Sequence, residues 1–186
     1  MDEPTLIRYA ANGDAMAWEP LVRAHQEAVF RLLYLLLGDP DDAEDIAQET
    51  FLRAWKHLKR FDPSRPIRPW LLSIASNLAS NRRRSAGRYF AALTRAFRNE
   101  PLTDTIEEKS VQNLQAGDLW KAIQVLNISD QQILYLRFFL DLSVAETAEV
   151  LHVAEGTVKS RLNRALDKLR RVIQQDFPVL IEGLEV

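Results

Sequence analysis

Residues 143–172 read SVAETAEVLHVAEGTVKSRLNRALDKLRRV, in which apolar residues form two helical patterns separated by a tight break. Ser143 followed by Glu146 is a capping box, in which each side chain accepts a hydrogen bond from a backbone N–H at the helix start. Small Ala148, with apolar residues around the break, suits two helices that cross steeply over a short turn. The second pattern steps by three and four residues through Val158, Leu162, Ala165, Leu169 and Val172. The stretch therefore predicts a helix-turn-helix.

The other face of the second helix carries side chains suited to DNA. They are Lys159, Ser160, Arg161, Asn163, Arg164, Lys168 and Arg171, with Asp167 as the acid among them. The first half of such a helix enters the major groove, where Lys can donate to guanine and Asn can pair with adenine. Arg161 and Arg164 flank these positions and suit phosphates. The alternative is an amphipathic helix with a solvated basic face, which many proteins that never bind DNA also have.

Two positions depart from the usual helix-turn-helix pattern. His152 stands where the turn favours Gly, which enters the left-handed region readily, although His tolerates this region better than most residues. Ala154 stands where Ser often caps the second helix, a loss of roughly 1 kcal/mol. Neither departure removes the motif.

Composition restricts the classes of function. The 186 residues suffice for one domain or two small ones, and the absence of cysteine excludes disulfides, thiolate metal sites and cysteine nucleophiles. The longest apolar run, Leu32–Leu37, is too short to cross a bilayer. The acidic N-terminus lacks the apolar segment of a secretory signal. We therefore expect a cytoplasmic protein without a membrane span.

Charge is segregated along the chain, although the net charge is only −2. Every charged residue from Asp39 to Glu49 is acidic, whereas Asp62 is the single acid between Arg53 and Arg98. Such segregation predicts two faces for two kinds of partner, one basic and one polyanionic.

The acidic segment opens a predicted helix over residues 41–58. The preceding helix, from Asp14 to Leu36, either kinks at Pro20 or begins just before it. Acids in a first helical turn suit the helix dipole, but this does not explain Leu52, which lies among polar neighbours. An apolar anchor ringed by acids is typical of a docking patch for a basic helix, and a single exposed leucine is the alternative. The patch consists of Asp45, Gln48, Glu49 and Leu52.

A proline-rich loop, residues 61–70, leads into another helix, with Pro69 suited to its first position. One face of this helix is polar and free of acids: Ser73, Asn77, Ser80, Asn81, Arg84 and Arg88. Asn and Ser beside Arg can bond bases as well as phosphates, which predicts capture of nucleic acid. A stiff connector followed by a solvated basic face is the alternative.

The remaining chain completes an all-α protein of two small helical domains joined by a flexible linker. We expect a first domain over residues 1–90, a linker over 91–116 that turns polar and acidic, and a second domain over 117–175. Ser129 followed by Gln132 predicts the capped start of a helix that leads into the helix-turn-helix. Residues 176–186 form a short apolar tail.

These features together resemble the extracytoplasmic-function (ECF) sigma factors of the sigma-70 family, the minimal two-domain class of RNA polymerase specificity subunit. The resemblance covers nearly the whole chain. Its most specific parts are GDPDDAEDIAQETFLRAW at residues 38–55, RPWLLSIASNLASNRRR at 68–84 and EGTVKSRLNRAL at 155–166. The third part alone also resembles the output domains of response regulators.

The resemblance implies a role for each patch. The acidic patch would dock on the clamp helices of the largest subunit of core RNA polymerase. Unstacked bases of the promoter −10 element would be captured by Ser64, Arg65, Ile67, Arg68, Trp70, Asn77, Asn81 and Arg84. The −35 element would be read in the major groove by Thr157, Lys159, Ser160, Arg161, Asn163 and Arg164. An anti-sigma factor is a further partner that the resemblance allows, and Ile67 replaces an aromatic residue often found in the loop.

Two other classes of function compete with this interpretation. A response-regulator type of transcription factor would end in a similar helix-turn-helix, but it needs an upstream domain of alternating strands and helices, and no strand pattern occurs here. An all-helical interaction protein or an enzyme is the third class. The histidines are scattered without a partner motif, and Asp39 and Asp41 fail as an EF-hand because Ala43 follows at the next ligand position. We expect no enzymatic activity, metal or cofactor.

Overall fold

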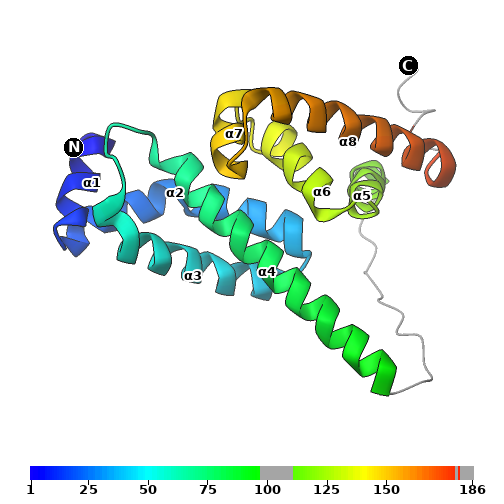
Figure 1. Cartoon of the computed structure of the whole chain (residues 1–186), viewed down its shortest axis with the longest axis horizontal. Helices are drawn as coiled ribbons and strands as arrows, with labels where there is room; N and C mark the ends of the chain where they lie inside the picture. The colour runs from blue at the N-terminus through cyan, green and yellow to red at the C-terminus, as the bar shows by residue number, and fades with distance from the viewer. Residues whose placement is uncertain (97–110, 179, 181–186) are drawn as a thin grey trace.

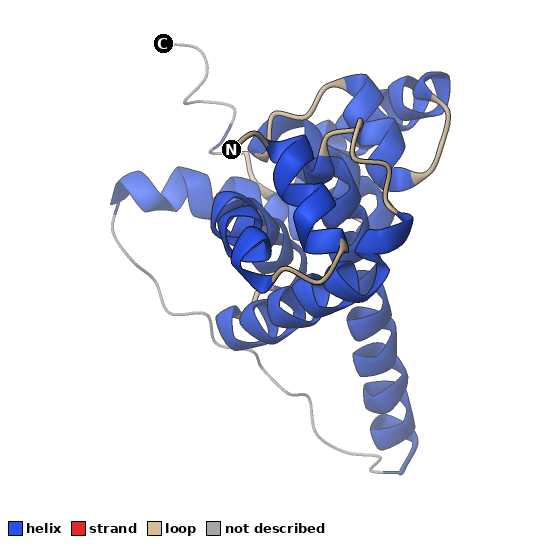
Figure 2. Ribbon diagram, turned by 90° about the vertical axis from the view of Figure 1, so that its left-hand side faces the viewer, coloured by secondary structure: helices blue, strands red, loops and turns tan. Residues whose placement is uncertain are grey.

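The computed structural model describes residues 1–96, 111–178 and 180, and it contains helices and turns without a strand in these ranges (Figures 1 and 2). The N-terminal domain comprises α1 (Glu3–Ala11), α2 (Ala15–Leu37), α3 (Pro40–His57), the 3-10 turn η1 (Leu58–Arg60) and α4 (Ile67–Ala96). The C-terminal domain comprises α5 (Val111–Gln124), α6 (Ile128–Leu134), the π-helical turn η2 (Tyr135–Phe139), α7 (Val144–Leu151) and α8 (Glu155–Asp176). The predicted all-α class with two domains is confirmed.

Helix α4 is the long element of the N-terminal domain, and its end projects away from the other helices (Figures 1 and 2). It continues to Ala96, and α5 begins at Val111, so both helices extend into the predicted linker over residues 91–116. Residues 97–110 of that linker, and most of the predicted tail over residues 176–186, lie outside the described residues.

Aspartates begin the first three helices. The carboxylates of Asp2, Asp14 and Asp39 each accept a hydrogen bond from a backbone N–H two or three residues later. Helix α2 passes through Pro20 without ending, so it starts at Ala15, ahead of the proline. It stops at Gly38, whose φ of 78° lies in the left-handed region that glycine enters without a steric penalty.

The core of the N-terminal domain forms where α2, α3 and α4 pack on one another. Each helix buries one apolar face there: Leu32, Leu33 and Leu36 from α2, Ala43, Ile46 and Ala54 from α3, and Leu71, Leu72 and Ala75 from α4. Burial of these faces follows the three-and-four spacing in the sequence.

In the C-terminal domain the predicted cap of α6 is wrong by two residues. Asn127, not Ser129, is the N-cap, and its side-chain oxygen accepts from the backbone N–H of Asp130 at 3.0 Å. The Asn127 amide also donates to the Asp130 carboxylate at 2.6 Å, while Ser129 is exposed. Gln132, predicted to complete the cap, instead donates to α4. Asn caps a helix as well as Ser does. Because Asn127 precedes Ser129 in the chain, α6 begins directly after Asn127.

Tyr135 lies at the centre of this domain and is fully buried. Its hydroxyl accepts a hydrogen bond from the Gln124 amide at 3.1 Å. Burial disfavours the phenolate and raises the pKa of Tyr135 to about 12. The Tyr135 hydroxyl therefore stays protonated, and its hydrogen bond to Gln124 holds α5 against the start of η2.

The cap position of α6 can be tested by a matched pair of substitutions. Asn127→Ala removes the cap and its bond to Asp130, so it should lower the free energy of unfolding by about 1–2 kcal/mol. Ser129→Ala should change it by less than about 0.5 kcal/mol, because Ser129 is an exposed side chain that does not cap the helix. Urea unfolding followed by circular dichroism gives both values. A larger loss from Ser129→Ala than from Asn127→Ala would contradict the assigned cap.

Candidate functional site: three exposed surfaces

The helix-turn-helix is formed by α7 and α8, as predicted. The Ser143 hydroxyl accepts from the backbone N–H of Glu146 at 3.1 Å, and the Glu146 carboxylate accepts from that of Ser143 at 2.7 Å. These bonds hold the pKa of Glu146 below its ordinary value. His152 is the C-cap of α7 with a φ of 53°, and Ala154 is the N-cap of α8 and offers no side-chain hydrogen bond. Both departures seen in the sequence are therefore present, and the motif forms despite them.

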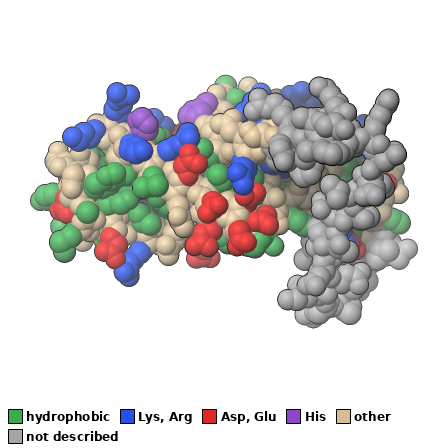
Figure 3. All heavy atoms as spheres, turned by 90° about the horizontal axis from the view of Figure 1, so that it is seen from below, with side chains coloured by type: hydrophobic (Ala, Val, Ile, Leu, Met, Phe, Trp, Pro, Cys, Tyr) green, Lys and Arg blue, Asp and Glu red, His purple; other side chains and the backbone are tan. Residues whose placement is uncertain are grey.

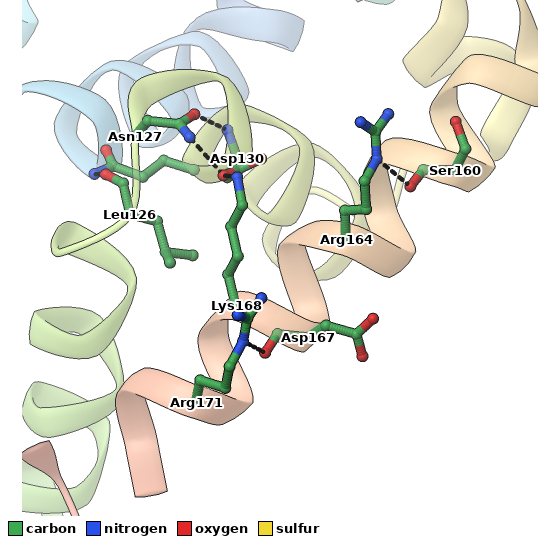
Figure 4. Close-up of polar contacts among 9 residues, drawn as sticks. Leu126, Asn127, Asp130, Ser160, Arg164, Asp167, Lys168 and Arg171 are labelled. Atoms are coloured by element: carbon green, nitrogen blue, oxygen red, sulfur yellow. Dashed lines mark hydrogen bonds and ion pairs between the residues drawn. The ribbon is translucent and has the colours of Figure 1, made fainter. Parts of the chain in front are cut away.

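Helix α8 presents the predicted reading surface to solvent. Val158 and Ala165 are fully buried against the rest of the domain. Around them, the exposed side chains are Lys159, Ser160, Arg161, Asn163 and Arg164, with Thr157 half-buried beside them. The Arg164 Nε donates to the Ser160 carbonyl at 3.2 Å, which orients the guanidinium and leaves its two terminal nitrogens for a ligand (Figure 4).

Lys168 lies on the same helix but is committed to a contact inside the domain. Its ammonium contacts the Asp130 carboxylate at 2.5 Å, and Asp130 is in turn bonded to Asn127 (Figure 4). Asp130 is 9% exposed, so loss of Lys168 would leave a nearly buried carboxylate without its cation. Lys168 thus ties α8 to the start of α6 and positions the reading surface, a role that its basic character in the sequence did not reveal.

The second surface is a groove between α2 and α3 with a volume of about 930 Å³. Leu52 is 61% exposed at its edge, which confirms that this leucine faces solvent. Packed rings form part of the wall, with Trp18 5.5 Å from Trp55 and 6.3 Å from Phe51 between centroids. The remaining lining side chains are Ala15, Val22, Gln26, Glu27, Phe30, Glu44, Ala47 and Gln48. Most of the residues that line the groove are therefore apolar, and a smaller number are polar or acidic.

The acids of α3 are partly neutralised within the domain. Glu49 pairs with Arg53 at 2.5 Å, and Asp42 pairs with Arg82 of α4 at 2.5 Å. Asp45 is exposed, and Gln48 lines the groove. Figure 3 shows a face of the molecule on which acidic and apolar side chains gather side by side.

Helix α2 contributes groove residues that the sequence analysis missed. Trp18, Val22 and Phe30 line the groove, and none of them was among the predicted site residues. The signal was present at Phe30 and Tyr34, which are four residues apart beside the buried stripe and stack with centroids 6.2 Å apart, each more than a third exposed. Exposed aromatic pairs of this kind are uncommon on a surface that contacts only water.

The third surface lies along α4. Asn77, Asn81 and Arg84 are exposed, and the Arg84 guanidinium donates to the Asn81 side-chain oxygen at 3.0 Å. The Asn81 NH₂ group is thereby left as the donor toward a ligand. These three predicted residues therefore form one polar surface without an acid.

The other residues predicted to bind the −10 element lie in and after the loop before α4, and they differ in how exposed they are. Asp62 accepts from the Ser64 backbone N–H and hydroxyl, which hold its pKa below the ordinary value and shape the turn. Ser64 is exposed, and Trp70 is half-buried against Phe61, with ring centroids 4.7 Å apart. Ile67 is fully buried and belongs to the core, because α4 begins there and not at Pro69.

The two arginines of this region contact the C-terminal domain. Arg65 pairs with Glu149 at 3.1 Å, and Arg68 donates to the Leu140 carbonyl at 2.8 Å. The serines of the polar stripe do the same, since Ser73 bonds to His152 and Ser80 to Gln132. From Ser73 to Arg84 the structure thus splits the predicted stripe into an exposed row and a row that faces the other domain, and the side chain of Arg88 lies outside the described residues.

The described residues offer no cluster of three or more His, Cys, Asp or Glu side chains that could hold a metal ion. His25 contacts Glu3 at 3.2 Å and His152 contacts Ser73 at 2.7 Å, while His57 is exposed on the surface. No helix within the described ranges combines the length and apolar character needed to cross a membrane.

Comparison with known proteins gives a consistent assignment for both domains. Residues 21–89 match the family described as Sigma-70 region 2, and residues 116–169 match Sigma-70, region 4. The ECF RNA polymerase sigma factor SigL of Mycobacterium tuberculosis is 33% identical over 169 residues, which cover 89% of this chain and 94% of SigL.

Solved structures of sigma factors have the same fold. CnrH, in complex with the cytosolic domain of CnrY, matches with a TM-score of 0.70 and 25% identity over 94% of this chain and 98% of CnrH. RpoE of Bartonella quintana, in complex with the anti-sigma factor NepR, matches with a TM-score of 0.66 and 25% identity over 85% of this chain and 97% of RpoE. The chain therefore belongs to the ECF sigma factors of the sigma-70 family and functions in promoter-specific initiation of transcription.

Proposed function

We propose that the three surfaces divide promoter recognition among them. The groove between α2 and α3 docks on core RNA polymerase, the exposed row of α4 captures the −10 element, and α8 reads the −35 element. The observation that carries this proposal is the exposed face of α8, where five polar and basic side chains surround the buried Val158 and Ala165.

The groove suits a helix that is apolar on one side and basic on the other. Its aromatic wall and Leu52 supply the apolar contact, and Glu27 and Glu44 supply negative charge. By resemblance to ECF sigma factors, we take this partner to be the clamp helices of the polymerase's largest subunit. Asp45 and Glu49 lie on the same helix as Leu52 and favour the approach of a basic surface.

The row of Asn77, Asn81 and Arg84 suits single-stranded DNA. Amide groups can bond the edges of unstacked bases, and Arg84 can contact a phosphate. Such edges become available only when the duplex is melted. We therefore assign this row to the non-duplex form of the −10 element.

The partners and the compartment follow from this assignment. Core polymerase and promoter DNA are the obligatory partners, and an anti-sigma factor is a regulatory one, by analogy with RpoE, which is bound by NepR. Because core polymerase and the chromosome lie in the cytoplasm, we assign the protein to the same compartment. The chain acts by binding and positioning, and we assign it no catalytic step of its own.

Core docking is tested by reversing the character of the groove edge. Leu52→Arg should weaken binding to core polymerase by roughly tenfold or more, because a charge replaces an apolar anchor. Val125→Arg is a matched control, since Val125 is also 61% exposed but lies in the other domain. Pull-down of core polymerase measures both, with circular dichroism to show that the helices remain. Equal binding by Leu52→Arg and the parent would contradict the docking assignment.

Single-strand capture is tested at Asn77. Asn77→Ala should reduce promoter opening more than initial duplex binding, because its ligand exists only in the melted state. Permanganate footprinting of the transcription bubble measures opening, and a gel-shift assay measures duplex binding. Asn12→Ala, a substitution at an exposed Asn at the end of α1, is the control. An unchanged footprint for Asn77→Ala would remove this residue from the −10 surface.

Base reading is separated from phosphate binding by a pair of substitutions on α8. Asn163→Ala should cost roughly 1–3 kcal/mol on the best −35 element and much less on a mismatched one. Arg164→Ala should weaken both duplexes alike and lower the salt slope by about one unit. Binding isotherms on two duplexes at several salt concentrations distinguish these outcomes. If Asn163→Ala weakened both duplexes equally, Asn163 would be a backbone contact.

A further inference from the structure

A carboxylate from the first helix reaches the start of α4. Glu3, the first residue of α1, accepts a hydrogen bond from the backbone N–H of Ile67 at 3.2 Å, although the two residues are 64 positions apart. Its second oxygen lies 3.2 Å from Nε2 of His25 on α2. Because a carboxylate only accepts hydrogen bonds, His25 Nε2 is the donor in this pair. Glu3 therefore joins the beginnings of α1 and α4 to α2, where α1 lies beside the loop that leads into α4 (Figure 1).

The loop before α4 supplies no cap of its own for this helix. Pro66, which directly precedes the helix, has no side-chain acceptor, and the guanidinium of Arg65 can only donate. The Ser64 hydroxyl is already bonded to the Asp62 carboxylate at 2.7 Å. The first N–H groups of a helix have no partner within the helix, and a buried N–H without a partner is unfavourable. Glu3 therefore caps α4 from a distant part of the chain.

The surroundings of the Glu3 carboxylate hold it in place. The His25 side chain is only 11% exposed, and Ile67 is fully buried. The N-termini of α1 and α4 both lie at this carboxylate, and the positive end of each helix dipole attracts it. The cap of α1 itself is a different residue, because the Asp2 carboxylate accepts from the backbone N–H of Thr5 at 3.1 Å. The bond from Glu3 to α4 is therefore separate from the capping of its own helix.

The first turn of α4 determines where the neighbouring loop lies. Trp70, in that turn, packs against Phe61 at the other end of the loop, with ring centroids 4.7 Å apart. Helices fray from ends whose N–H groups lack partners, so a bond at the first position keeps this turn closed. Fraying would release Trp70 and the loop residue Ser64 from their fixed relation to the exposed row that begins at Asn77. Glu3 thus acts on residues assigned to the −10 element by resemblance, without being one of them.

We propose that Glu3 is a positioning residue for recognition of the −10 element, because its carboxylate holds the first turn of α4 and the loop before it in the place from which they contact DNA. This inference deepens the proposed function and rests on it. Glu3 lies ahead of residues 21–89, which match Sigma-70 region 2, and it is not among the residues of the three surfaces. Its effect should be confined to the −10 element, since the −35 surface lies on α8.

Two substitutions separate the contact of Glu3 from its charge. Glu3→Asp keeps a carboxylate at the start of α1 but is one methylene too short to reach the Ile67 N–H, whereas Glu3→Gln loses the charge and keeps an oxygen at the same reach. Amide hydrogen exchange at Ile67, measured by NMR, should be faster by roughly fivefold or more in Glu3→Asp and by less than about twofold in Glu3→Gln. Glu19→Asp, at an exposed acid paired with Arg23, is the matched control and should leave exchange unchanged. Exchange in Glu3→Asp equal to the parent, or faster exchange in Glu3→Gln than in Glu3→Asp, would overturn the proposal.

Promoter selectivity is the second test. Open-complex formation by the full chain with core polymerase is measured at limiting protein on the best promoter, on one with a single −10 mismatch and on one with a single −35 mismatch. The ratio of best to mismatched promoter does not depend on the folded fraction, so a variant that is merely less stable leaves it unchanged. Glu3→Asp should lower the −10 ratio by roughly threefold or more and leave the −35 ratio as in the parent, whereas Glu3→Gln should keep both.

The outcomes distinguish this inference from the proposed function. An unchanged −10 ratio in Glu3→Asp, together with reduced promoter opening in Asn77→Ala, would refute the positioning role while the proposed function stands. Equal falls of the −10 and −35 ratios would also refute it, because the effect would not be confined to the −10 element. A parent protein without any −10 preference would contradict the proposed function, and this inference with it.

Discussion

Helix α4 is the element on which the rest of the structure depends, because three of its faces are in use at once. Leu71, Leu72 and Ala75 pack into the N-terminal core, and Ser73 and Ser76 lie under the C-terminal domain, each 4% exposed. The remaining face carries the exposed row that begins at Asn77. A helix offers about 100° to each such face, so a small rotation of α4 would disturb the core, the domain contact and the proposed DNA surface together.

Charge contributes less to the proposed docking surface than a count of acids suggests. Two acids of α3 are paired with arginines, Glu49 with Arg53 and Asp42 with Arg82 of α4. Surface pairs of this kind are worth only about 0–1 kcal/mol, but they reduce the field that a partner experiences. The affinity of the groove therefore depends mainly on its apolar wall, and charge acts on the rate and orientation of encounter.

The sequence was sufficient for features determined by near neighbours. The capping box at Ser143, the left-handed turn at His152 and the exposure of Leu52 all depend on residues within a turn or two. Features that depend on distant residues were missed. The aromatic wall combines α2 with α3, and a hydrogen bond joins Ser73 to His152, 79 residues away. An acid-free polar stripe has the same composition whether it faces water, DNA or another domain, so the sequence could not separate Ser73 and Ser80 from Asn77 and Asn81. The cap at Asn127 was missed because two good capping residues stand close together.

The isolation of the proposed reading surface on α8 has an evolutionary consequence. Lys159, Arg161 and Asn163 are exposed, and the side-chain bonds of Ser160 and Arg164 within the described residues reach only the backbone of α8 itself. Replacing such side chains changes stability by about 0.5 kcal/mol or less. A duplicated gene could therefore drift to a new promoter preference while its product still folds and docks on the same polymerase. Divergence of regulons would then require few substitutions, all on one face of one helix.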